Sequence, residues 1–260
     1  MTPMFVDSHC HLDFPEFRER LPEVLANMKS SQVSHALCVS VDIPDFPRVL
    51  QLAQENANLY ASVGVHPDYE DTPEPTVEFL VDTASKHAKI IAIGETGLDY
   101  FRTPPELRKR QQDSFKWRIE LAKKTNKALV IHDRDSHDDV LSVLLEVGAP
   151  EKTVFHCFSG DVAMAKLCIE RGYILSFAGT LTFKNAPELR EAVKLVPADQ
   201  LLVETDSPFL APSPHRGSGN TPAQIANIVR AMAVERDQDL AELATALSVN
   251  AERIFGSFAP

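Results

Sequence analysis

The sequence predicts an α/β fold, a single (β/α)8 TIM barrel that occupies residues 1–260 as one domain. Eight short β-rich apolar runs recur at fairly even intervals, and segments with helical periodicity lie between them. This alternation is the pattern of a barrel of eight parallel strands, and the chain length suits one such domain.

Each predicted strand is a short, continuous apolar run, which is typical of strands buried on both faces. The runs are MFVDSH at 4–9, HALCVS at 35–40, LYASVGV at 59–65, KIIAIGE at 89–95, ALVIH at 128–132, KTVFH at 152–156, YILSF at 173–177 and LLVET at 201–205.

Apolar residues at three- and four-residue spacing predict helices between these strands. The clearest segments are 15–30, 105–126, 137–148, 160–172 and 221–236. Gly148 and Gly172 indicate helix ends, and Thr221 followed by Pro222 indicates a helix start. An open doubly wound sheet is the alternative, but no G-x-G-x-x-G follows an early strand.

The composition limits the possible partners and locations. A formal net charge of −11 repels a polyanion at long range and disfavours tracking along nucleic acid, while local phosphate binding stays possible. The four cysteines form no C-x-x-C motif, so we expect reduced thiols. We find no signal-peptide pattern and no apolar run long enough to span a membrane, and we expect a cytoplasmic monomer.

Histidines and carboxylates gather at the predicted carboxyl ends of the strands, the face that carries the active site in barrel enzymes. They are His9, His11, His66, Glu95, His132, His156 and Asp206. A lone histidine at a strand end is usually a polar rim residue, but this accumulation favours a metal site. The set exceeds what one tetrahedral ion needs and suits two ions bridged by a carboxylate, roughly 3.5–4 Å apart.

The two-residue period of a strand places His9 and His11 on the same side, so both can bind one cation. Cys10 then points to the other side and is discounted as a ligand. Asp7 shares the histidine side and is a candidate for orienting an imidazole.

A series of motifs runs through residues 5 to 255: DSHCHLD, SVGVHP, AIGETGLDY, VIHDRD, VFHCFSG, GTLTFKNAPELR and LLVETDSPFLAPSPHRG. In this order they resemble the TatD family of metal-dependent deoxyribonucleases, within the amidohydrolase-like barrel superfamily. The resemblance implies a phosphodiester-cleaving hydrolase of the 3′–5′ exonuclease type that binds DNA ends transiently.

The resemblance also implies a ligand set for two divalent ions per chain, with Zn²⁺ the first expectation and Mg²⁺, Mn²⁺ or Ni²⁺ the alternatives. The first ion is assigned to His9, His11 and Asp206, the second to His132 and His156, and Glu95 is expected to bridge them. Two cations would lower the pKa of a bound water toward neutrality, with Asp206 as the general base. His66 would contact a phosphate oxygen or protonate a leaving group, or else only cap a turn.

Two places depart from the family's pattern. Asp133 stands where the family usually has Thr or another small polar residue, and it either lies beside the second metal or points away along the strand. The loop after the eighth strand reads HRGSGNTP, without the usual Lys, which weakens the expected affinity for DNA.

Other side chains near the expected mouth have more than one interpretation. Arg134 is either a phosphate contact or the partner of a neighbouring aspartate, and Lys184 and Arg216 are phosphate contacts or solvated loop cations. Tyr100 and Phe158 would stack on a base or simply pack.

Asp99 orients a ligand or closes a turn, and the turn is the simpler interpretation.

Two other functions compete with the nuclease. The same metal chemistry would serve an amidohydrolase-type enzyme that cleaves an ester or C–N bond in a small molecule or an aminoacyl-tRNA. A non-enzymatic barrel with structural metals predicts closed coordination, and the surplus of polar rim residues disfavours it.

Overall fold

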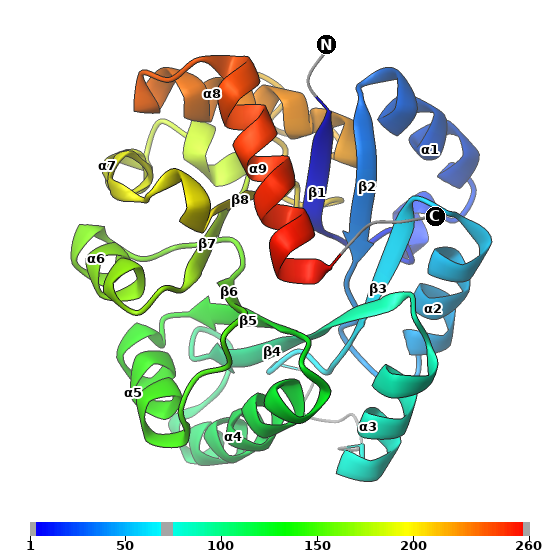
Figure 1. The fold of residues 1–260 in the computed structure, drawn as a ribbon, viewed down its shortest axis with the longest axis vertical. Helices are drawn as coiled ribbons and strands as arrows, with labels where there is room; N and C mark the ends of the chain where they lie inside the picture. Colours follow the sequence, from blue (N-terminus) through cyan, green and yellow to red (C-terminus); the bar gives the residue numbers. More distant parts are fainter. Residues whose placement is uncertain (1–3, 69–74, 257–260) are drawn as a thin grey trace.

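The computed structural model describes residues 4–68 and 75–256 and confirms the (β/α)8 barrel (Figure 1). The strands pair in parallel, each with the next in sequence, in the order β1 to β8. Each predicted apolar run overlaps one of them. The strands are β1 (Phe5–Cys10), β2 (Val33–Cys38), β3 (Leu59–Val63), β4 (Ile90–Asp99), β5 (Ala128–Arg134), β6 (Thr153–Phe155), β7 (Ile174–Phe177) and β8 (Leu201–Val203).

Helices follow the strands and surround the barrel (Figure 1). They are α1 (Leu21–Ser30), α2 (Phe46–Glu55), α3 (Val77–Lys86), α4 (Arg108–Thr125), α5 (His137–Val147), α6 (Val162–Glu170), α7 (Pro187–Leu195), α8 (Ile225–Arg236) and α9 (Leu240–Phe255). Within the described residues, no helix combines the length and apolar character needed to cross a membrane.

Two predicted helices are shorter than the sequence suggested because proline restricts where a helix can begin. Pro15–Phe17 and Pro105–Leu107 form separate 3-10 turns ahead of α1 and α4. Pro22 lies in the first turn of α1, where its missing N–H costs nothing, whereas it would break a helix that continued from residue 15.

Helix ends agree better with the sequence than helix starts. Gly148 follows α5 with φ of 81°, the left-handed region that glycine enters without strain. Thr221 precedes a 3-10 turn over Pro222–Gln224, and its side chain makes no capping hydrogen bond. The helix predicted to begin there therefore begins only at Ile225.

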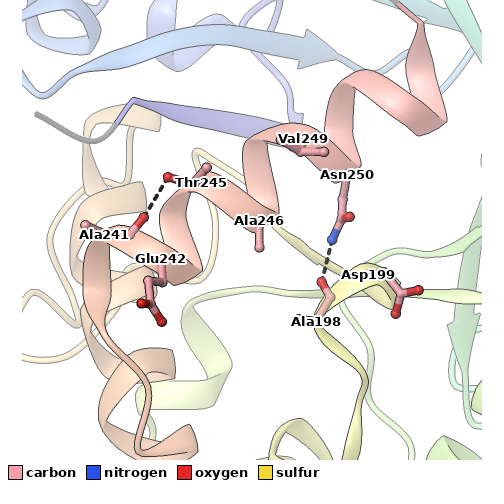
Figure 2. A pocket seen from close by; sticks show the side chains of 8 residues that line it. All are labelled: Ala198, Asp199, Ala241, Glu242, Thr245, Ala246, Val249 and Asn250. Carbon is pink, nitrogen blue, oxygen red and sulfur yellow. Dashed lines mark hydrogen bonds between the residues drawn. The ribbon is translucent and has the colours of Figure 1, made fainter. Parts of the chain in front are cut away.

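An apolar layer fills the inside of the barrel, and α9 closes its amino-terminal end. Ile254 and Phe255 of α9 pack in this layer with strand residues such as Val6 and Leu37. In Figure 1 α9 accordingly lies across the middle of the ring of strands. Figure 2 shows how α9 is held: Asn250 Nδ2 donates to the Ala198 carbonyl oxygen at 2.7 Å.

The hollow beside this contact is not a candidate metal site. Small or apolar side chains such as Ala246 and Val249 line most of it, and its lining residues include no histidine or cysteine (Figure 2). With this end covered by α9, the carboxyl ends of the strands are the place where functional side chains meet.

The barrel closes between β8 and β1 through a few individual hydrogen bonds rather than a continuous ladder. An isolated bridge joins Cys10 to Ser207, and the His11 N–H donates to the Ser207 carbonyl oxygen at 2.8 Å. Asp7 spans the same seam, because its Oδ1 accepts the Thr205 N–H at 2.9 Å and its Oδ2 accepts the Thr205 hydroxyl at 2.5 Å. The expectation that Asp7 orients an imidazole was wrong, because its carboxyl oxygens accept from Thr205 and from the backbone N–H of His9 at 3.3 Å.

We expect Asp7→Asn to flatten the pH dependence of stability in the metal-free protein. Burial raises the pKa of Asp7 from 3.8 to about 8, although hydrogen bonds from Thr205 oppose the shift. Between these values the folded state binds more protons than the unfolded state, so this carboxyl lowers the free energy of unfolding as pH rises. Denaturant unfolding across this range should show a smaller decline in the variant. An unchanged decline would contradict this, and Asp82→Asn on exposed α3 is the control.

Candidate metal centre

The six predicted metal ligands and His66 converge at the carboxyl ends of the strands. His9 lies in β1 and His11 directly follows it, while His156 directly follows β6. His132 lies two residues before the end of β5. Glu95 does not end its strand as predicted, because β4 continues to Asp99, with irregular pairing to β5 between Ile93 and Thr96.

The first donor group lies where the first strand meets the last, because His9 and His11 come from β1 and its end and Asp206 follows β8. His9 Nε2 and His11 Nε2 lie 3.3 Å apart. Asp206 Oδ1 lies 3.3 Å from His11 Nε2 and 3.8 Å from His9 Nε2. Cys10 takes no part, because its thiol donates to the Leu37 carbonyl oxygen at 3.4 Å in the layer behind the strand.

Glu95 connects this group to a second one, with one carboxylate oxygen facing each. Its Oε2 lies 3.4 Å from His9 Nε2 and 3.9 Å from His11 Nε2. Its Oε1 lies 2.9 Å from His132 Nδ1 and 2.8 Å from His156 Nε2. The two oxygens of one carboxylate thus face two neighbouring groups of donor atoms.

The second group contains more donors than the two assigned from the family resemblance. His132 Nδ1 and His156 Nε2 lie 3.5 Å apart. His66 Nε2 lies 3.1 Å from His132 Nδ1 and 3.5 Å from Glu95 Oε1, while His66 Nδ1 contacts Asp68. His66 is therefore positioned among the donors as well as at the rim.

Both carboxylates carry negative charge at neutral pH. Burial opposes ionisation of Glu95, but His156 and His66 outweigh it and hold its pKa well below the usual range. Burial likewise opposes ionisation of Asp206, but the hydrogen bond from His11 outweighs it and lowers the pKa of Asp206. Ionised carboxylates are the form that binds a cation.

The imidazoles respond differently to the same surroundings. Burial, with repulsion from His156, lowers the pKa of His9 and keeps it neutral. Burial lowers the pKa of His11 too, but the Asp206 carboxylate outweighs it and raises the value to about 9. Protons and cations therefore compete for these nitrogens, and metal binding releases protons.

These donors fit divalent cations. Five imidazoles and two carboxylates direct nitrogen and oxygen atoms at one another within 4 Å in a largely buried space. The triads His9–His11–Asp206, His9–Glu95–His156 and His66–Asp99–His132 each offer atoms within 4.8 Å of one another. Mixed imidazole and carboxylate donors suit Zn²⁺, Mn²⁺ and Ni²⁺.

Groups behind the donors orient several of the rings, whereas the buried His9 Nδ1 has no hydrogen-bond partner in the described residues. The His11 Nδ1 lies 3.1 Å from the Val39 carbonyl oxygen, and the His132 Nε2 lies 3.1 Å from Asp99 Oδ2. Asp99 also closes the following turn, because its Oδ1 accepts the N–H of Phe101 at 3.0 Å. Asp99 thus closes a turn and also contacts His132, and a contact of this kind fixes the tautomer of an imidazole that binds a metal.

Glu204 orients His156 and was missed by sequence reasoning. It is fully buried, and its Oε1 lies 3.1 Å from His156 Nδ1 and accepts the Cys157 N–H at 2.8 Å. Its position directly after β8 and two residues before Asp206 was the available signal.

We expect Glu204→Gln to weaken metal binding in the second group by roughly 10–100-fold, because the glutamine amide no longer holds His156 in one orientation. Titration of the metal-free variant against a competing chelator measures the loss. Glu188→Gln on exposed α7 is the matched control, and equal affinities in both variants would contradict the orienting role.

Several residues with open interpretations lie away from the donors. Asp133 points away, because its Oδ1 accepts the Ser136 hydroxyl at 2.8 Å and its Oδ2 lies 2.7 Å from His137 Nδ1. Phe158 is buried, and the Tyr100 hydroxyl donates to Asp139. Phe158 and Tyr100 therefore pack rather than offer a surface to a base.

The predicted basic residues lie at the surface. Lys184 is exposed, and Arg216 lies 4.0 Å from the centroid of the Phe183 ring. Arg134 likewise lies 4.0 Å from the Phe101 ring centroid, and in the described structure it pairs with neither neighbouring aspartate. Of these three, Arg134 lines the cleft of about 480 Å³ that opens above the donors.

A TIM barrel with two joined groups of imidazole and carboxylate donors defines a metal-dependent hydrolase. The chain belongs to the TatD family, because the family model described as "TatD related DNase" matches residues 6–256.

Similar proteins span nearly the same length. The uncharacterized metal-dependent hydrolase YcfH of Escherichia coli is 40% identical over 96% of this chain and 95% of its own. The uncharacterized metal-dependent hydrolase TatD of Mycobacterium tuberculosis is 38% identical over 96% and 97%. The crystal structure of the TatD homologue YjjV from Escherichia coli superposes with a TM-score of 0.92 at 31% identity, covering 98% of this chain and 99% of that one.

Proposed function

We propose that the protein is a deoxyribonuclease that hydrolyses phosphodiester bonds at DNA ends, removing nucleotides in the 3′–5′ direction. The observation that carries this proposal is the division of the donors by Glu95, which places one carboxylate oxygen in each of two groups. Sites with two bridged divalent ions are a recurring solution for phosphodiester hydrolysis. The family's description as TatD-related DNase supports the same reaction.

Six residues would hold the cations. His9, His11 and Asp206 would hold the first, His132 and His156 the second, and Glu95 both. When bound, two divalent ions supply an activated water and offset the charge of the phosphodiester, and Zn²⁺ is our first candidate.

Asp206 is proposed as the general base. Its carboxylate is ionised and its side chain remains 14% exposed, so it is reachable from the cleft, whereas Glu95 is 3% exposed. A base must accept a proton over hydrogen-bond distance from the water that attacks. Asp206 and Glu95 both line the cleft and contact the first group, and Asp206 is the more exposed of the two.

His66 is proposed to contact the substrate phosphate or its leaving group. Its ring lines the cleft beside the second group, and its Nε2 faces Glu95 and His132. We also propose that the protein acts as a monomer and that it acts in the cytoplasm, and the four free thiols support the cytoplasmic location.

A second candidate function is the hydrolysis of an ester or C–N bond in a small molecule or an aminoacyl-tRNA. The volume of the cleft, about 480 Å³, suits a small ligand, and the acidic chain disfavours long nucleic acid.

One assay set distinguishes the two functions. Chelated protein reloaded with Zn²⁺, Mn²⁺, Mg²⁺ or Ni²⁺ is offered labelled single- and double-stranded DNA and, separately, ester and amide substrates. We expect nucleotides to be released from DNA ends. Turnover of esters or amides without DNA cleavage under any metal would reject the nuclease.

A further inference from the structure

A groove lies beside α9 at the amino-terminal end of the barrel, on the far side from the donors (Figure 2). We call it the α9 groove, and its volume is about 620 Å³. One wall is the 3-10 turn Ala198–Gln200 that leads into β8. The other wall is one side of α9, whose lining residues form two rows spaced by four positions. These residues are Ala241, Glu242, Thr245, Ala246, Val249 and Asn250.

The polar groups in the α9 groove already have partners within the chain. Asn250 Nδ2 donates to the Ala198 carbonyl oxygen at 2.7 Å, and the Thr245 hydroxyl donates to the Ala241 carbonyl oxygen at 2.8 Å (Figure 2). Val249, by contrast, is apolar and 56% exposed. The floor of the groove therefore offers mainly apolar surface to a ligand.

Exposed apolar side chains extend this surface beyond the groove. Met4 is 52% exposed and lies close to α9, because the Ser248 hydroxyl donates to the Met4 carbonyl oxygen at 2.8 Å. Leu195, the last residue of α7, is 44% exposed and precedes Ala198 by three positions. An exposed apolar patch with a polar rim is typical of a protein interaction site.

Two carboxylates mark the ends of the α9 groove. Figure 2 shows Glu242 near the start of α9 and Asp199 at the other end. In the part of the chain that the structure describes, neither carboxylate lies in an ion pair, whereas Glu191 on α7 pairs with Lys194 at 2.7 Å. Arg253 donates to the backbone carbonyl oxygen of Asp199, not to its carboxylate. The groove therefore presents negative charge at both ends.

We propose that the α9 groove binds a basic amphipathic helix of a partner protein. The apolar face of this helix lies on Ala246 and Val249, and its lysine or arginine side chains pair with Glu242 and Asp199. The lining residues of α9 extend from position 241 to 250, roughly 14 Å, which accommodates about three turns of a helix. The partner is thus defined by a short apolar stripe with cations at both ends.

Two other occupants fit the groove less well. Its walls are a helix and a 3-10 turn, which give an extended peptide no strand edge to pair with. A second copy of this chain, related by a two-fold axis, would bring Glu242 and Asp199 against the same carboxylates. Like charges across an interface are unfavourable, whereas a basic partner complements both these carboxylates and the net charge of −11.

The docking surface is independent of the proposed reaction. α9 closes the amino-terminal end of the barrel, and the donors meet at the carboxyl ends of the strands. A helix bound in the α9 groove therefore leaves the cleft above the donors open. Docking at this face positions the enzyme without changing its chemistry.

Three fluorescein-labelled peptides of about 14 residues test the groove in the full-length protein. The first has leucines at three- and four-residue spacing with lysines beside them. The second has glutamates in place of the lysines, and the third is a scrambled form of the first that lacks an apolar face. Fluorescence anisotropy measures the dissociation constants. We expect the first peptide to bind about tenfold more tightly than either of the others.

Substitutions test the apolar and the charged parts of the groove separately. Val249→Glu places a charge on the apolar floor and should weaken binding of the first peptide about tenfold. Glu242→Lys and Asp199→Lys should each weaken the first peptide and strengthen the second by roughly fivefold. All three side chains are exposed, so the variants should keep the wild-type fold, which thermal denaturation checks.

Matched controls lie away from the groove. Leu145→Glu replaces a side chain that is 60% exposed on α5, and Glu78→Lys reverses a charge in the first turn of α3. Equal weakening by the control and the groove variants would show general attraction of a cationic peptide to an acidic protein and would overturn the proposal. Absent binding, or equal binding of the first and scrambled peptides, would overturn it as well.

Sedimentation of the protein without peptide tests the remaining occupant. We expect a monomer in the wild type and in Val249→Glu. A wild-type dimer that Val249→Glu dissociates would assign the groove to a second copy of this chain, and the basic partner would be rejected.

Discussion

Replacing Asp206 with Asn is expected to reduce turnover by roughly 10²–10⁴-fold while the chain keeps its fold and much of its metal. The amide cannot accept a proton from water, yet it keeps the shape of the side chain and one oxygen toward His11. The backbone contact that holds this residue, from its N–H to the His9 carbonyl oxygen at 2.9 Å, is also retained. Steady-state kinetics and elemental analysis on one preparation measure both quantities.

Asp133→Asn is the matched control for this substitution. Asp133 lines the same cleft, but its carboxylate is occupied by Ser136 and His137. We expect its turnover to stay within a few-fold of wild type. A fully active Asp206→Asn protein would show that another group takes the proton.

Removing Glu95 is expected to have a comparable effect for a different reason. Glu95→Ala deletes one carboxylate oxygen from each donor group, so metal content should fall from the proposed two ions to one or fewer. With the proposed phosphodiester substrate, turnover should fall on the order of 10³-fold or more, because the positive charge that would offset the phosphodiester is lost together with the metal. Elemental analysis after equilibration with excess metal and desalting checks the stoichiometry.

Glu95→Gln distinguishes bridging from mere proximity. Glutamine keeps the volume and one oxygen, so it can serve one group but not both. If the variant still retained two ions with wild-type affinity, a bridging role for Glu95 would be excluded. Glu23→Ala, in the exposed first turn of α1, controls for the loss of an acidic side chain.

The strands and the class of fold were predictable because eight apolar runs are short, evenly spaced and separated by helical segments. Helix starts were less predictable, since Pro15, Pro105 and Pro222 each open a 3-10 turn before the α-helix. The last helix, α9, follows the eighth strand–helix unit and so falls outside the repeating pattern.

The donors were predictable because parallel strands in a barrel deliver their last residues to one rim. The residues behind them were not, since their partners come from distant elements. Glu204 contacts His156 from 48 positions away in the sequence, and Asp7 contacts Thr205 from 198 positions away. Which aromatic side chains face the cleft likewise depends on loop packing. Phe14 and Phe209 line it, whereas Tyr100 and Phe158, the two candidates from the sequence, do not.

The contact between β8 and β1 also determines when the first donor group can assemble during folding. A chain is synthesised from its amino terminus, so His9 and His11 exist long before Asp206. Asp206 meets them only after the last strand has docked against the first, through Cys10, Ser207 and the Asp7–Thr205 bonds. The first donor group is therefore complete only when β8 has docked against β1, and a chain truncated before residue 206 lacks its carboxylate.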